Sequence, residues 1–117
     1  MHNFKELKVW QKGRKFVKDI YLLTRNFPQE ELFVLTSQMR RAAISIPSNI
    51  AEGSGRGSDK DFARFIDIAT GSSFELESQL YVASDLEYFS EEDLDYYLDK
   101  IQELQKMLFH FKKHLNA

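Results

Sequence analysis

Two groups of residues have the types and spacing that metal or phosphate chemistry uses. His110 and His114 are four residues apart in "HFKKH", which places both rings on one face of a helix. This run lacks the glutamate of zinc-binding metalloprotease helices. The loop "GSGRGS" follows a predicted helix rather than a strand and lacks the Gly-Lys-Ser/Thr ending of a phosphate-binding loop. Because the chain also contains no cysteine, we expect no catalytic residue, no metal and no cofactor, and we predict that it is not an enzyme.

A third group is polar and is spread over two predicted helices, where intervals of three and four residues place its members on two stripes. If the stripes face each other, Arg41 can pair with Glu75 through two parallel hydrogen bonds. The Asn49 amide can satisfy backbone groups that Pro47 frees. Two interpretations stay open: the network fixes the register of two helices, or it lines a polar pocket for a ligand or partner. The candidate polar network contains Arg41, Ser45, Asn49, Glu52, Ser72, Glu75 and Gln79.

Basic residues are concentrated near the N-terminus. Residues 1–25 contain seven Lys and Arg against two acidic residues, whereas residues 58–88 contain two against seven. The whole chain has a formal net charge of −2. The two segments neutralise each other within the fold, or the basic segment faces an acidic partner or phosphates. The candidate nucleic-acid-binding residues are Lys5, Lys8, Lys12, Arg14 and Lys15.

The elements that must position these residues are four helices. Apolar residues recur at intervals of three and four in four blocks, and no stretch alternates with the period of a strand. Pro28, the loop "GSGRGS" and the run "YFSEEDL" separate the blocks, and Ser58 and Ser90 are typical N-cap residues. Short connections make consecutive helices antiparallel. The sequence therefore predicts an all-α, up-down-up-down four-helix bundle that forms one domain over residues 1–117.

Pro47 falls inside the second predicted helix and frees the carbonyl of Ala43 from its usual hydrogen bond. Either the helix ends at Ile46, or it bends at Pro47 and continues to a C-cap at Gly53. The apolar phase continues through the proline, because Ala42, Ile46 and Gly53 stay on one face. We therefore predict a continuous helix that is kinked at Pro47.

The motifs "LKVWQKG", "SQMRRAAISIPSNIAEG" and "FARFIDIATGSSFELESQL", followed by an amphipathic helix, cover nearly the whole chain. This ordered set resembles the four-helix bundle proteins encoded in intervening sequences of bacterial 23S rRNA genes. That family includes the accessory variability proteins of diversity-generating retroelements. The resemblance implies a bundle that assembles into a ring-like homopentamer. For the retroelement members it also implies that a basic surface binds nucleic acid and a reverse transcriptase.

The function predicted from these observations is that of a non-enzymatic oligomeric scaffold, with the chain itself as partner in a homopentamer. Aromatic residues make up 14% of the sequence, which indicates a second apolar surface besides the core. The alternative is an accessory protein that binds RNA or DNA, or a nucleic-acid enzyme, through its basic N-terminal helix. No apolar run approaches the ~18 residues that span a bilayer, and the run "MHNFKELKVWQKGRK" lacks the apolar stretch of a signal peptide. We therefore expect no membrane contact and a cytoplasmic location.

Overall fold

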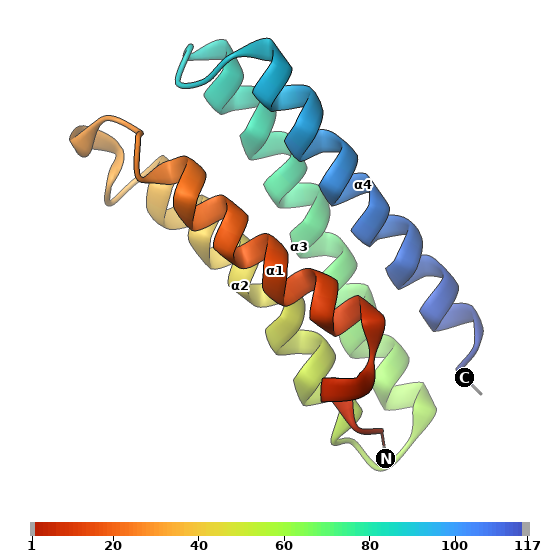
Figure 1. Ribbon diagram of the computed structural model, residues 1–117. Coiled ribbons are helices and arrows are strands. Elements are labelled where there is room, and N and C mark those ends of the chain that lie inside the picture. The colour runs from red at the N-terminus through yellow and green to blue at the C-terminus, as the bar shows by residue number, and fades with distance from the viewer. Residues whose placement is uncertain (1, 116–117) are drawn as a thin grey trace.

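The computed structural model describes residues 2–115 and contains four long helices, which run antiparallel to their neighbours in one elongated bundle (Figure 1). The predicted all-α bundle is confirmed. Two short 3-10 segments precede the first and second long helices. The elements are η1 (Phe4–Glu6), α1 (Lys8–Thr24), η2 (Gln29–Glu31), α2 (Leu35–Ser54), α3 (Asp59–Asp85) and α4 (Glu91–Lys113).

Each long helix packs on two others, in the cyclic order α1, α2, α3, α4. The α2–α3 pair has the most extensive contact, and α1 touches α4 least. Helical periodicity explains which side chains are inside, because positions three and four apart fall on one face. The fully buried large side chains come from all four helices: Phe62, Ile20, Met39, Ile46, Ile50, Ile66, Leu76, Leu80, Ile101 and Leu108.

The helix starts follow the predicted capping residues. Ser58 Oγ accepts a hydrogen bond from the backbone N–H of Asp61 at 3.1 Å, and Ser90 Oγ accepts one from Asp93 at 3.1 Å. Each hydroxyl satisfies one of the backbone donors that an α-helix leaves unpaired in its first turn. The acidic residues after each cap also interact favourably with the positive end of the helix dipole.

The α3–α4 turn is held by a helix-terminal motif and by a contact with η2. Glu87 adopts φ 62°, and the N–H groups of Glu87 and Tyr88 donate to the carbonyls of Ser84 and Ala83, as in a Schellman motif. The Tyr88 hydroxyl then donates to Glu31 Oε2 at 2.6 Å. This hydrogen bond raises the pKa of Tyr88 to about 12, because it stabilises the neutral phenol. The contact fixes two loops at one end of the bundle to each other.

Helix α2 continues without interruption through Pro47 and ends at Ser54. The prediction of one helix across the proline is correct, and the bend itself stays a prediction. The predicted C-cap at Gly53 is wrong, because Gly55 occupies the capping position. Gly53 instead lies where α2 meets the start of α3. A Cβ at Gly53 would lie 2.7 Å from Phe62 Cδ1 and 2.7 Å from Phe65 Cβ, closer than real side chains approach.

We expect Gly53→Ala to lower the free energy of unfolding by about 1–3 kcal/mol, because two buried phenylalanines must move to admit a methyl group. Gly71→Ala is the matched control. Gly71 also lies inside a helix, but a Cβ there meets nothing within 4 Å. The control should stabilise the protein by roughly 0.5–1 kcal/mol, because alanine loses less backbone entropy on folding. Urea denaturation measures both changes, and equal effects at the two sites would contradict the close packing described for Gly53.

Candidate interaction surfaces

The predicted network places its ion pair between α2 and α3. Arg41 Nη2 lies 2.7 Å from Glu75 Oε2, so the two stripes do face each other at this point. The pair is joined by one hydrogen bond rather than the predicted two. The other donors of the guanidinium point along α2, where Nε and Nη2 lie 3.2 and 2.8 Å from Gln38 Oε1. Gln38 was not predicted as a member of the polar network. A glutamine three residues before Arg41 is also typical of an ordinary exposed position on a helix, so the spacing alone does not indicate the contact.

Two serines join the same pair of helices one turn further along. Ser45 Oγ and Ser72 Oγ are 2.8 Å apart, and both side chains are partly buried. Asn49 Nδ2 donates to the Ser45 carbonyl at 2.8 Å and lies 2.9 Å from Ser45 Oγ. The amide therefore reaches the carbonyl of Ser45 and not that of Ala43, which Pro47 frees. Asn49 does bond a backbone carbonyl near Pro47, but the prediction that the acceptor is a group freed by the proline is wrong.

The remaining two members lie at the limits of the network. Glu52 is outside it, because its carboxylate turns to Arg56, 3.7 Å away on the next turn of chain. Gln79 Nε2 is 3.5 Å from Glu75 Oε2, a long hydrogen bond. Gln79 Oε1 is buried and has no hydrogen-bond partner among residues 2–115. A buried acceptor without a partner lowers stability, so this end of the network is its weakest point.

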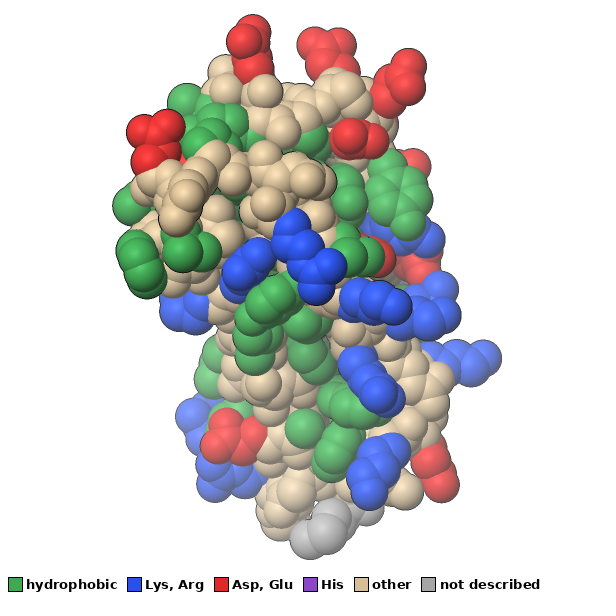
Figure 2. Space-filling model, turned by 60° about the vertical axis from the view of Figure 1, so that its left-hand side comes forward, with side chains coloured by type: hydrophobic (Ala, Val, Ile, Leu, Met, Phe, Trp, Pro, Cys, Tyr) green, Lys and Arg blue, Asp and Glu red, His purple; other side chains and the backbone are tan. Residues whose placement is uncertain are grey.

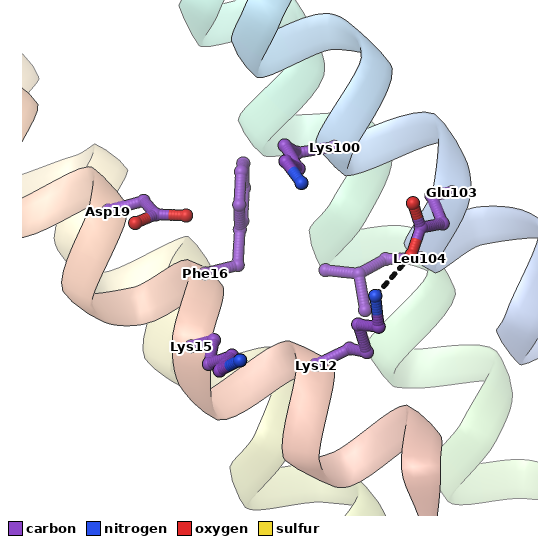
Figure 3. A pocket seen from close by; sticks show the side chains of 7 residues that line it. All are labelled: Lys12, Lys15, Phe16, Asp19, Lys100, Glu103 and Leu104. Atoms are coloured by element: carbon purple, nitrogen blue, oxygen red, sulfur yellow. Dashed lines mark ion pairs between the residues drawn. The ribbon is translucent and has the colours of Figure 1, made fainter.

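The basic candidates of α1 do not share one face. Lys12 and Lys15 turn toward α4 and line a small hollow of about 100 Å³ with Lys100, Asp19 and Glu103 (Figure 3). Within it, Lys12 Nζ lies 2.9 Å from Glu103 Oε1, as the dashed line shows. The Lys12 ammonium lowers the pKa of Glu103 by donating a hydrogen bond to its carboxylate and by its charge. Three ammonium groups against two carboxylates leave the hollow only weakly basic.

The other three candidates lie elsewhere. Arg14 is on the opposite side of α1, with its guanidinium 5.5 Å from the centroid of the Trp10 ring. Lys5 and Lys8 are exposed near the start of the helix. No ion pair joins Lys5, Lys8, Arg14 or Lys15 to an acidic side chain within residues 2–115. The structure thus sets Arg14 apart from the lysine candidates of α1.

A groove runs between α1 and α2, on the other side of α1 from Lys12. Two hollows of about 360 and 500 Å³ meet at Ile44, which lines both. Figure 2 shows this face, with hydrophobic side chains in its middle and Lys and Arg side chains around them. Acidic side chains gather instead at the end that carries η2 and the α3–α4 turn. We call this feature the basic groove and define it by Trp10, Arg14, Tyr21, Phe33, Arg40 and Ile44.

The charged side chains that line the groove are all arginines. Arg40 Nε donates to Thr24 Oγ1 at 2.9 Å, and its guanidinium lies 4.5 Å from the centroid of Tyr21. Neither Arg14 nor Arg40 forms an ion pair with any described carboxylate. Both cations therefore keep hydrogen-bond donors that an acidic partner can use.

The histidines considered for metal binding have another geometry. His114 Nδ1 lies 2.7 Å from the carbonyl of His110, so its ring interacts with the backbone of α4. Among residues 2–115, no cluster of three or more His, Cys, Asp or Glu side chains is placed to hold a metal ion. Nor does this part of the chain contain a helix with both the length and the apolar character that crossing a membrane requires.

Comparison with known proteins agrees with the fold. The family model described as 23S rRNA-intervening sequence protein matches residues 5–110. The chain belongs to the 23S rRNA-intervening sequence protein family. A crystal structure from Bacteroides thetaiotaomicron, of a protein with unknown function from the S23 ribosomal protein family, is similar at 27% identity with a TM-score of 0.82. The match covers 90% of this chain and 95% of that one. No curated protein matches the chain.

In this member of the 23S rRNA-intervening sequence protein family, Glu75→Gln tests whether the polar network is structural. Arg41 and Glu75 are both largely exposed, so we expect a loss of only about 0.5 kcal/mol and a small fall in melting temperature. Glu6→Gln is the control, because Glu6 is exposed and forms no ion pair within the described chain. If Glu75→Gln changes neither the melting temperature nor the size of the assembly, a structural role for the pair is wrong.

Proposed function

We propose that this protein is a non-enzymatic helical bundle whose copies associate into a ring-like homopentamer and act as an interaction scaffold. The observation that carries the proposal is the large apolar surface left outside the core. Phe33 is 89% exposed, Phe109 60% and Phe74 56%. Phe33 lies beside η2, Phe109 on α4 and Phe74 on α3. Other apolar side chains that are more than 40% exposed are Ile44, Ile68, Tyr81, Val82 and Leu86.

Exposed apolar side chains are common one at a time, but adjoining ones usually mark a surface that another molecule covers, and Phe74 and Phe109 line one hollow between α3 and α4. The core is already closed, because its largest side chains have under 2% of their surface accessible. The outer aromatics therefore cannot be absorbed by a small repacking of one chain. Association of copies removes this surface from water and is the arrangement that the family resemblance implies.

Light scattering after size exclusion tests the proposal over a dilution series from about 100 µM to 1 µM. The single chain has a mass of 13.8 kDa. We expect five times that mass at the upper concentrations, with a fall in mass on dilution. A mass of one chain throughout the series would contradict the proposal.

A second candidate function is binding of nucleic acid, and it is favoured by Lys8 and Lys15, which are exposed and form no ion pair with a described acidic side chain. In a ring these side chains would recur in every copy and form a belt, which compensates for the low charge of one chain. Lys12 contributes less than the sequence implies, because Glu103 partly neutralises it. Arg14 points toward α2 and would not join the same belt.

Electrophoretic shifts with structured RNA and duplex DNA test this candidate at about 50 mM salt, where phosphate contacts are strongest. We expect binding that weakens steeply as salt rises and that Lys8→Glu with Lys15→Glu abolishes. Lys60→Glu with Lys106→Glu is the control, since it makes the same change in net charge away from α1. Absence of a shift at low salt, or equal losses in the two double variants, would contradict a site on α1.

A further inference from the structure

The basic groove and one face of α4 carry opposite charges. Helix α4 carries Glu92, Asp95, Tyr96 and Asp99 at intervals of three, one and three residues, so the four side chains share one face. All four are exposed, and Tyr96 is 50% exposed. We call these residues the acidic face. None of its three carboxylates forms an ion pair with a described cation.

We infer that the basic groove of one copy binds the acidic face of α4 of a second copy. This inference rests on the proposed function, and it names the surfaces that make the contact. Tyr96 supplies the apolar anchor for the groove at Ile44 and Tyr21. The carboxylates of Asp95 and Asp99 supply acceptors for Arg14 and Arg40, whose guanidinium groups have no carboxylate partner among residues 2–115.

Self-pairing of either surface is electrostatically unfavourable. Two grooves face to face would bring Arg14 and Arg40 against the same cations of the partner, and two acidic faces would bring carboxylates together. The favourable contact is therefore head-to-tail, with different surfaces on the two copies. A contact of this kind repeats from copy to copy and closes into a ring when the rotation between copies allows it. Each copy then contributes one groove and one face.

Complementation between charge-reversed variants tests the contact. The groove variant carries Arg14→Glu and Arg40→Glu, and the face variant carries Asp95→Lys and Asp99→Lys. Each alone places like charges at the contact, so we expect self-association at least about tenfold weaker than that of the unmodified chain. An equimolar mixture should associate again, as mixed dimers and larger even-numbered assemblies, because each reversed surface meets an oppositely charged one only on the other variant. A closed ring of five would retain one contact between like charges, so mixed dimers are the expected minimum product. Lys8→Glu with Lys60→Glu is the control and should assemble normally, because both side chains are exposed and lie outside the basic groove and the acidic face.

Two results would overturn the inference while the proposed function stands. In the first, the unmodified chain is oligomeric and both variants assemble as well as it does. In the second, both variants are folded by circular dichroism and monomeric, yet the mixture stays monomeric. A monomeric unmodified chain would instead contradict the proposed function, and with it this contact. A monomeric unmodified chain is also the result expected if the groove binds an acidic segment of another protein.

Cross-linking gives a second measurement that does not require the charge-reversed variants to fold. The chain contains no cysteine, so Ile44→Cys and Tyr96→Cys each introduce a single thiol. With a short bismaleimide, we expect cross-linked dimers from a mixture of the two variants and little product from either alone. Product from Ile44→Cys alone would show a groove-to-groove contact. An assembled mixture that gives no cross-link would show that the copies meet elsewhere. Either result overturns the inference.

Discussion

The close packing of α2 on α3 is the constraint on which the rest of the molecule depends. Gly53 lets the backbone of α2 approach Phe62 and Phe65, and Ser45 and Ser72 meet one another across the same interface. These small residues let α2 and α3, the pair of helices with the most extensive contact, approach closely. The apolar stripes of the two helices then fix how they pack on each other. The other two helices pack onto this pair. Helix α1 packs beside α2 at Gly13, where a Cβ would lie 3.5 Å from Ile46 and 3.8 Å from Pro47, which are ordinary contact distances, and the basic groove lies along this pair of helices.

Most of the fold follows from the sequence because periodicity and capping are local signals. The four apolar blocks, the caps at Ser58 and Ser90 and the continuation of α2 past Pro47 all need only residues within a few turns of one another. Gly53 is different. A glycine near a helix end has the same local signature whether it caps the helix or admits a neighbouring one, and only the position of α3 decides between them.

The candidate surfaces were less predictable for the same reason. Spacing on α1 groups Lys8 with Lys12 and Lys15, but it cannot show that Glu103 of α4 lies 2.9 Å from Lys12 or that Arg14 faces α2. Likewise, Glu52 has the correct interval for the polar network, yet its carboxylate lies 3.7 Å from Arg56 Nη2. The basic groove combines side chains of α1, α2 and the η2 segment, so no single stretch of sequence indicates it.

The central claim is that another copy covers the basic groove, and Trp10 reports on it most directly. Trp10 is the only tryptophan of the chain, and it lies in the groove between Phe4 and Arg14. Its fluorescence emission should move to longer wavelength on dilution, over the same concentrations at which light scattering shows the assembly separating, because water then reaches the ring. An emission maximum that stays constant while the assembly separates would contradict the claim, since the groove would then be open to water in both states.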